Sequence, residues 1–406
     1  MDSTLLYSLQ ILYYSSFFFI PFFLAILFYD IFLNYKRAIW HGKQDYRLLE
    51  IKIPREIFKS PKAMEFFING LFKGDDEDTW VHTKIYGQTR PDSSLEIVSI
   101  GGQIHFYVRV RKWLKPVVEG TLYSQFPGIE ISDVPDYTLS VSYDDPNTVG
   151  LWGTEFALRK EDVFPIKTYI DYGMDKDPKE EYKIDPLTPF IEYIGSFGRG
   201  HQMWLQIMIR THKAEDKDPV TGKKVDLKWQ KDAEKQIKKI LENAKGEKGE
   251  DGRYGSSRFL TQAEQETISA LERSISKNGF DVGMRFIYTA PKDIFVTSNL
   301  TGAVGSIMNF NANNLNGFKT ANATGSKYIY PWQKKFSKKK VIQEKREMLD
   351  AYKRRCFFYA PYKRKYFVLN TEELATIFHF PGIVSTTPTY ERIESRKAEA
   401  PANLPV

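Results

Sequence analysis

The sequence has one cysteine in 406 residues, Cys356, and this scarcity excludes several kinds of site. A single thiol cannot form an intramolecular disulfide or supply a cluster of thiolate metal ligands. The six histidines are far apart along the chain, and no two of them have the spacing of a helical metal site. We therefore predict no metal site, and the composition is consistent with a reducing compartment.

Motifs for nucleotide binding and catalysis are also missing. A phosphate-binding loop requires glycine-rich backbone that turns into a helix, together with a lysine. The Gly222-Lys223 pair lacks the first glycine of that motif, because Lys217 occupies its position. The glycines in residues 195–200 do not have dinucleotide-binding spacing, and a strand is expected to follow them. We predict no catalytic residues and no cofactor; an enzyme of unrecognised type is the alternative.

Charged residues are absent from the N-terminal region between Asp2 and Asp30. The apolar run at 11–29 is long enough, at about 1.5 Å per residue, to cross a hydrocarbon core of about 30 Å. We predict one transmembrane helix, kinked at Pro21. The region lacks the basic start and small-residue cleavage site of a signal peptide. A buried helix of a soluble protein is the remaining alternative.

Basic residues follow this helix, and none precedes it. Lys36, Arg37 and Lys43 lie just beyond the apolar run. Positively charged flanks stay in the cytoplasm, so we expect a single-pass protein of the inner (cytoplasmic) membrane with most of its chain on the cytoplasmic side. Residues 1–45 are then the anchor and juxtamembrane segment, and membrane lipid is a partner.

Residues 46–145 show a β-α-β-β-α-β rhythm. Alternating and helical apolar patterns predict, in order, a strand at 46–53, a helix at 60–74, a strand at 80–86, a hairpin of strands at 94–100 and 103–111, a helix at 113–126 and a strand at 129–134. Apart from the strand at 80–86, this order is the split βαβ pattern called ferredoxin-like. We predict one ferredoxin-like module here.

Residues 146–330 repeat the rhythm more loosely and predict a second α/β sandwich module. The expected elements are a helix at 186–197, a strand at 201–211, helices at 227–244 and 261–277, and a strand at 280–289. Thr261 and Glu264 form a capping box. Two charged segments, 213–224 and 245–257, are expected to be mobile loops, and 309–326 a loop or insertion.

Residues 331–366 hold most of the positive charge. They carry 13 Lys or Arg against three acids, a net +10 that leaves −3 for the rest of the chain. Aromatic residues are interleaved with them, a combination that can bind single-stranded nucleic acid. A solvated helix face and contact with anionic lipid are the alternatives. The predicted basic patch comprises Lys334, Lys335, Lys338, Lys339, Lys340, Lys353, Arg354, Arg355, Lys363, Arg364 and Lys365.

The C-terminal region, 331–406, ends in a short helix and a proline-containing tail. Residues 371–377 are expected to form the helix, with two glutamates in its first turn, where the helix dipole favours acids. The tail beyond 382 has few large apolar side chains, so we expect an extended strap that docks on another polypeptide; a disordered tail is the alternative. The predicted partner-binding residues are Leu369, Glu372, Glu373, Phe378, Phe380, Pro381, Pro401, Asn403, Leu404 and Pro405.

Two of these segments, LNTEELATIFHFPG at 369–382 and PANLP at 401–405, carry a family resemblance. They resemble the region that precedes the nucleotide-binding core in membrane-anchored ATPases of the conjugation and type IV secretion class, within the HerA/FtsK-like superfamily, of candidate-phyla bacteria. The resemblance implies membrane-anchored α/β modules that position a hexameric translocating ATPase. The Walker residues of that family have no counterpart here.

These observations predict an α+β protein with one transmembrane helix, two ferredoxin-like modules and a C-terminal strap. The expected function is a non-enzymatic membrane scaffold of a conjugation or secretion machine that docks a separately encoded ATPase subunit. A membrane-tethered nucleic-acid-binding protein that acts through 334–365 is the alternative, and self-association into a homo-oligomer is compatible with either.

Overall fold

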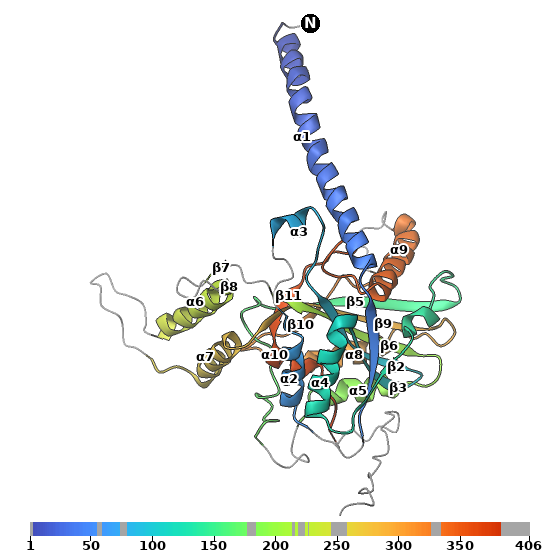
Figure 1. The fold of residues 1–406 in the computed structure, drawn as a ribbon, viewed down its shortest axis with the longest axis vertical. Coiled ribbons are helices and arrows are strands. Elements are labelled where there is room, and N and C mark those ends of the chain that lie inside the picture. Colours follow the sequence, from blue (N-terminus) through green and yellow to red (C-terminus); the bar gives the residue numbers. More distant parts are fainter. Residues whose placement is uncertain are drawn as a thin grey trace, which may run out of the picture.

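In the computed structural model, one long helix projects from a body of mixed α and β structure (Figure 1). The predicted α+β class with a single N-terminal apolar helix is confirmed. The structure describes residues 3–54, 59–73, 79–176, 184–212, 216–217, 224–225, 227–244, 258–325 and 334–382.

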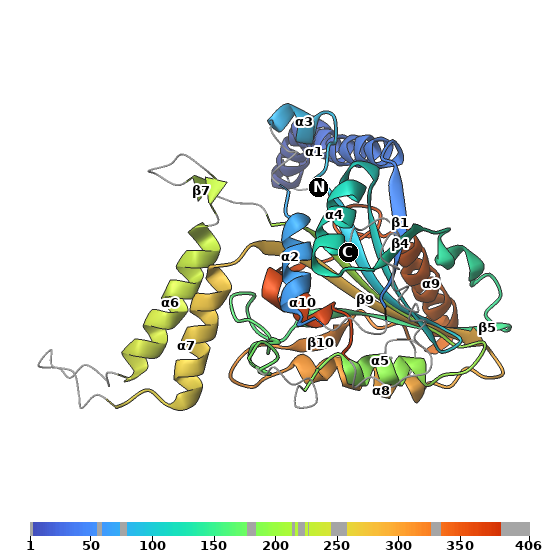
Figure 2. The same ribbon diagram turned by 60° about the horizontal axis from the view of Figure 1, so that its bottom comes forward.

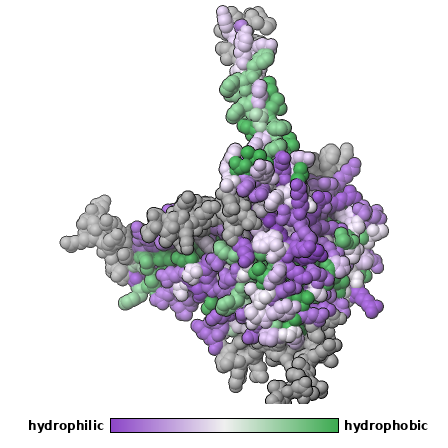
Figure 3. Space-filling model, in the orientation of Figure 1, coloured by the Kyte–Doolittle hydropathy of each residue, from purple (hydrophilic) through white to green (hydrophobic). Residues whose placement is uncertain are grey.

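Helix α1 (Ser3–Gly42) is continuous through Pro21, and its apolar side chains from Phe17 to Ile31 are exposed. Phe18, in the middle of the apolar run, is 74% exposed. Figure 3 shows this run as a green column above a largely purple body. Such a surface is unfavourable in water. Among the described residues, the part of α1 from Tyr13 to Gly42 is the one stretch long and apolar enough to cross a membrane.

The first module has the predicted ferredoxin-like arrangement. Its strands lie in the order β2-β3-β1-β4, and all neighbouring strands are antiparallel. The elements in chain order are β1 (Tyr46–Lys52), α2 (Lys62–Gly70), β2 (Asp92–Ile100), β3 (Gln103–Arg111), α4 (Lys115–Gln125) and β4 (Glu130–Asp133).

The strand predicted at 80–86 is wrong, because this stretch is helix α3 (Trp80–Lys84). Thr79 caps the helix, with its hydroxyl oxygen accepting a hydrogen bond from the His82 backbone N–H at 3.3 Å. The residues alternate as a strand would, but Trp80 is 67% exposed, so no apolar face is buried against a sheet. The local cap therefore decides the conformation.

The second module repeats the strand order of the first. Its strands lie in the order β10-β5-β9-β6. Numbered along the chain within each module, both modules have the strand order 4-1-3-2. The elements are β5 (Val149–Leu158), α5 (Thr188–Gly195), β6 (Gln202–Thr211), β9 (Gly279–Pro291), α8 (Asn299–Ile307) and β10 (Phe318–Ala321). Strand β10 lies in 309–326, which the sequence pattern indicated as a loop.

The two modules join through antiparallel pairing of β2 with β6, from Asp92 opposite Arg210 to Ile100 opposite Gln202. The result is one sheet of nine strands with one large apolar core on its helical side. The boundary between residues 145 and 146 therefore separates two repeats of the chain. The two repeats nevertheless share one hydrogen-bonded sheet and one apolar core. Short 3-10 helices occur at η1 (Lys112–Leu114), η2 (Tyr137–Ser140) and η4 (Met308–Phe310).

A helical hairpin is inserted between β6 and β9 and projects from the body (Figure 2). It consists of α6 (Leu227–Ala244) and α7 (Gln262–Ile275), and the predicted capping box of Thr261 and Glu264 is confirmed at the start of α7. Of the two predicted loops, 245–257 lies outside the described residues. The described part of 213–224 pairs as β7 (Asp216–Lys217) with β8 (Lys224–Val225).

The two faces of the sheet are covered differently (Figure 2). Helices α2, α4, α5 and α8 pack on one face, together with α10 (Thr371–Ile377). Helix α9 (Lys334–Lys353) packs on the other face through Met348, Leu349 and Tyr352. Strand β11 (Phe367–Asn370) then pairs with the first residues of β9, from Gly279 to Val282. The C-terminal region is thus part of the same body.

Candidate functional site at the base of helix α1

A row of polar side chains crosses the α9 face of the sheet. Glu96, Gln206, Arg285 and Glu155 lie opposite one another on β2, β6, β9 and β5. Each bonds to the next: Gln206 donates to Glu96 at 3.2 Å, and Arg285 donates to Gln206 at 3.4 Å and to Glu155 at 2.9 Å. Since all four are buried, the mutual hydrogen bonds offset the cost of desolvation.

Arg355, which follows helix α9, bonds to the Glu96 end of this row. Its guanidinium donates to both carboxylate oxygens of Glu96, at 3.0 and 3.2 Å, and to both oxygens of Asp136. Burial disfavours the charged form of Glu96, but the charge and hydrogen bonds of Arg355 outweigh burial and hold the pKa of this carboxyl below its ordinary value.

The backbone of Arg355 ends helix α9. Its φ of 50° is left-handed, a conformation that glycine adopts most easily. The Arg355 N–H bonds to the Tyr352 carbonyl and the Cys356 N–H to the Ala351 carbonyl, each at 3.0 Å, the two bonds of a Schellman motif. Arginine occupies the glycine position because its side chain reaches Glu96.

A second polar cluster centres on Asp281, which is completely buried. Its carboxylate accepts hydrogen bonds from Arg210 at 2.8 Å and Arg90 at 3.3 Å, and it lies 2.5 Å from the His212 ring nitrogen. The ring of Phe358 covers the Arg210 guanidinium at 4.3 Å. The arginines of this cluster therefore already have an acidic partner and an aromatic partner within the same chain.

Helix α1 is fixed to this face at its C-terminal end. Gly87 approaches the backbone of Lys36 and Arg37 so closely that a Cβ there would lie 2.7 Å from the Arg37 nitrogen. The Arg37 guanidinium lies 5.2 Å from the Tyr359 ring, and the His41 ring lies 5.5 Å from the same ring. The anchor helix is therefore packed directly onto the body.

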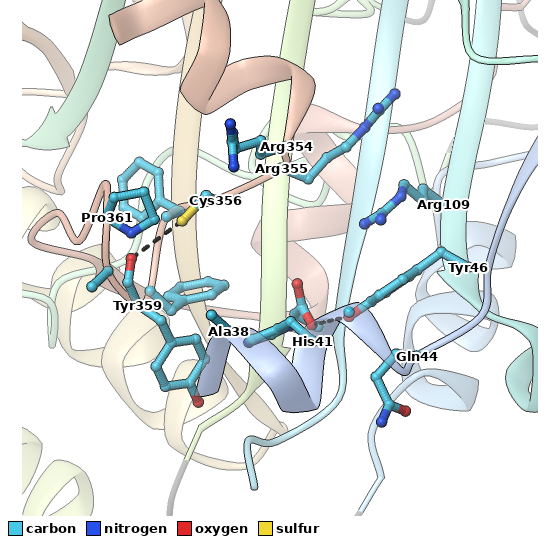
Figure 4. A pocket seen from close by; sticks show the side chains of 15 residues that line it. Ala38, His41, Gln44, Tyr46, Arg109, Arg354, Arg355, Cys356, Tyr359 and Pro361 are labelled. Atoms are coloured by element: carbon cyan, nitrogen blue, oxygen red, sulfur yellow. Dashed lines mark hydrogen bonds between the residues drawn. The ribbon is translucent and has the colours of Figure 1, made fainter. Parts of the chain in front are cut away.

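A cavity of about 400 Å³ lies where α1 meets the sheet. Figure 4 shows Ala38 and His41 of α1 on one side, Tyr46 and Arg109 of the sheet on another, and the segment 354–361 after α9 opposite them. Three separate parts of the chain thus form its walls. This cavity, with its mixture of guanidinium groups and aromatic rings, is the candidate functional site.

The structure divides the predicted basic patch. The side chains at 338–340, Lys363 and Lys365 are exposed, while Lys334 and Lys335 lie in the first turn of α9. The remaining four have partners within the chain: Lys353 donates to the Val141 carbonyl, Arg354 pairs with Asp350, Arg355 pairs with Glu96 and Asp136, and Arg364 pairs with Glu155. The patch is therefore not one continuous cationic surface.

Two aromatic residues of this segment are also buried within the chain, whereas Tyr366 is 38% exposed. Phe357 and Phe358 are 2% and 5% exposed, and Phe357 lies 5.2 Å from the Arg285 guanidinium. These rings cover arginines of the sheet and are not available to stack on bases. The nucleic-acid interpretation depended on exposed rings, and these two residues do not supply them.

The segment 369–382, which the sequence pattern predicts to contact a partner, is buried within the body of this chain. Leu369, Glu372, Glu373, Phe378, Phe380 and Pro381 are all buried within this chain. Leu369 pairs with Phe280 in the sheet, and Glu372 forms ion pairs with Arg273 at 3.0 Å and Lys277 at 3.1 Å. The apolar pattern that indicated a partner surface is satisfied by the protein's own core. Pro401, Asn403, Leu404 and Pro405 lie outside the described residues.

Sequence patterns did not identify Tyr46, Asp92 or Arg109 as members of a site. Each occupies an ordinary alternating position on a strand, and 354–361 is more than 240 residues away along the chain. The one available signal was the set of polar residues on one face of two strands in the middle of the sheet, Asp92, Ser94 and Glu96 in β2 and Gln202, Gln206 and Arg210 in β6.

Glu373 gives the protein an expected pH dependence. Burial raises the pKa of this carboxyl to about 8, although the N–H groups of Asn370 and Ile166, each at 2.9 Å, favour the charged form. The folded protein then keeps a proton that the unfolded chain releases near pH 4.5. We expect the free energy of unfolding to fall between pH 5 and 8, by up to about 1.4 kcal/mol per pH unit.

Urea unfolding in a nonionic detergent, followed by tryptophan fluorescence at several pH values, measures this slope. The Glu373→Gln variant should show a flatter profile, and the difference between the two proteins isolates Glu373 from the histidines. An equal slope in both proteins, or stability that rises with pH in wild type relative to the variant, would contradict the expectation.

The described residues contain no cluster of three or more histidine, cysteine, aspartate or glutamate side chains able to hold a metal ion. A family model described as a domain of unknown function, DUF8128, matches residues 36–392. None of the curated proteins matches the chain. The matched stretch begins in the last two turns of α1 and covers the whole double module, and the protein therefore belongs to the DUF8128 family.

Proposed function

We propose that this protein is a single-pass scaffold of the inner membrane, without catalytic activity of its own, which holds a separately encoded translocation ATPase of a conjugation or secretion machine. The observation that carries the proposal is the direct packing of α1 on the body, where Lys36, Arg37 and His41 contact the segments before β2 and after α9. A body fixed to its anchor holds a bound partner at a set height and orientation above the bilayer, which a flexible tether does not.

The orientation rests on the charges that flank the apolar run. Lys36, Arg37 and Lys43 follow it, so the body lies on the cytoplasmic side. A translocation ATPase requires cytoplasmic ATP, and this orientation presents the body to that compartment. The family resemblance of the C-terminal segments supplies the class of partner.

Because 369–382 is buried in this chain, we propose that the partner contact is made by the residues that follow this segment in the sequence. Phe380 packs on Phe106 and Phe126, so the chain reaches Gly382 on the helical face of the sheet. The cavity at the base of α1 lies on the opposite face. The described chain therefore ends on the face away from the cavity, and we assign the partner contact to the residues that follow it in the sequence.

Co-purification from membranes tests the proposal. Full-length protein and a variant that ends at Gly382 are extracted in mild detergent after cross-linking, and bound proteins are identified by mass spectrometry. We expect the full chain to retain a protein with a phosphate-binding loop, and the shortened chain to lose it while remaining folded in the membrane.

A variant with residues 383–406 in scrambled order is the matched control, since it preserves length and composition. It should also lose the ATPase. Retention of the same ATPase by the shortened chain, or the absence of any such ATPase from the full-length sample, would refute the docking proposal.

A further inference from the structure

We propose that the cavity at the base of α1 binds a phosphate group. The cavity holds about 400 Å³, enough for a phosphate with a small attached group. Its cationic wall comes from β3 and the end of α9, and its apolar wall comes from Ala38 and the loop through Pro361. The inference concerns a site separate from the C-terminal residues, so it stands or falls independently of the scaffold proposal.

Arg109 is the main cationic group of the proposed phosphate site. Its guanidinium lies over the Tyr46 ring at 3.7 Å. Within the described ranges, no carboxylate lies within ion-pair distance of it and no acceptor takes a hydrogen bond from it. Stacking on tyrosine fixes the plane of the guanidinium without using its N–H donors. A pre-oriented cation therefore faces the cavity with its donors unsatisfied.

The surrounding charges compensate this cation only in part, because Asp92, which also lines the cavity, has Tyr46 and Arg111 as its own partners. Burial and the nearby charge of Arg355 lower the pKa of Arg109, while Asp92 acts in the opposite direction. Asp92 itself accepts a hydrogen bond from Tyr46 at 2.8 Å and lies 4.0 Å from Arg111. A bound anion would relieve the repulsion between Arg109 and Arg355.

A phosphate fits this arrangement better than a carboxylate. Arg354 also lines the cavity, and its Nε is the atom that bonds to Asp350, so its terminal amines are not committed to that ion pair. A phosphate can accept from Arg109 and Arg354 at once, because it has more acceptor oxygens and more charge than a carboxylate.

The phosphate could belong to a soluble compound or to a phospholipid headgroup. His41 lies twelve residues beyond Tyr29, the end of the apolar run, which is about 18 Å along the helix. The headgroup layer extends only about 5–7 Å beyond the hydrocarbon core. A soluble phosphate compound is therefore the source that the geometry favours, and a headgroup reaches the cavity only if α1 tilts.

Cys356 provides a direct test, because it is the single thiol of the chain and lines the cavity. The rate at which a small methanethiosulfonate reagent modifies Cys356 is measured in the full-length protein in zwitterionic detergent. We expect inorganic phosphate to slow the modification saturably, while chloride and acetate at matched ionic strength leave the rate unchanged. The lipid arm repeats the measurement in nanodiscs of phosphatidylcholine with and without phosphatidylglycerol.

The Arg109→Gln variant should bind phosphate at least about tenfold more weakly. Lys363→Gln, the same loss of charge at an exposed position outside the cavity, should bind as wild type does. Thermal unfolding of each variant with and without phosphate provides a second readout, and wild type alone remains decisive if Arg109→Gln fails to fold.

Protection by phosphate that depends on Arg109 supports the soluble source, and protection confined to phosphatidylglycerol nanodiscs supports the lipid source. Absence of protection in both arms overturns the proposal. So does equal protection in Arg109→Gln, and equal protection by acetate overturns the assignment to phosphate.

Discussion

Replacing Arg355 with alanine is expected to lower the free energy of unfolding by about 3–5 kcal/mol. The substitution leaves Glu96, which is completely buried, without the guanidinium that bonds to both of its oxygens, and it removes the cation paired with Asp136. The loss is costly because the donors that remain on Glu96, from Ser94, Gln206 and Tyr137, are neutral and do not balance its charge. Urea unfolding in detergent, followed by tryptophan fluorescence, measures the change.

Arg354→Ala is the matched control. Arg354 is exposed and pairs with Asp350 one helical turn earlier, an interaction worth about 0.3–0.5 kcal/mol. Position 355 keeps its left-handed backbone in the alanine variant, so the comparison isolates the side chain. Arg355→Gly should recover about 1 kcal/mol relative to alanine by removing that strain. Equal stability of the Arg354 and Arg355 alanine variants would show that the pair does not support the fold.

Ending the chain after Val368 is expected to abolish folding of the body, whereas ending it after Gly382 leaves the fold intact. The residues between these two points place large apolar side chains in the core: Leu369, Leu374, Ile377, Phe378 and Phe380. At about 1.5–3 kcal/mol each, their burial contributes roughly 10 kcal/mol, which is comparable with the whole stability of a typical domain.

Expression of the two shortened proteins, followed by limited proteolysis and circular dichroism of the detergent-extracted material, tests this expectation. The protein that ends at Gly382 should resist proteolysis as the full chain does, and the one that ends at Val368 should aggregate or be degraded. A folded, protease-resistant protein that ends at Val368 would show that β11 and α10 are dispensable. The result also decides how any partner-binding assay with C-terminal deletions is to be interpreted.

Local patterns predicted much of the fold. The alternation in β2 and β3, with two glycines between them, identified the hairpin, and Thr261 and Glu264 identified the start of α7. At the start of α10, Glu372 and Glu373 correctly indicated a helix N-terminus. Their burial could not be predicted, because the compensating groups, Arg273 and the Ile166 N–H, are about 100 and 200 residues away.

The candidate site depended on tertiary structure more than the fold did. Arg109 and Tyr46 become neighbours because β1 and β3 pair with Leu48 opposite Arg109. The loop after α9 reaches them only because α9 packs on the same face of the sheet. The pattern of basic and aromatic residues at 353–366 was visible in the sequence, but its meaning changed once the rings were found to cover Arg210 and Arg285.

The sequence by itself determined the apolar helix α1, the scarcity of metal-ligating and catalytic motifs, and the ferredoxin-like order of the first module, because each follows from composition or from periodicity over neighbouring residues. Only the tertiary structure decided that β2 and β6 merge two modules into one sheet, that 369–382 completes the core, and that a cavity forms under α1. Those outcomes depend on strand register and burial between distant segments, and the periodicity of either segment alone specifies a face but not the partner that covers it.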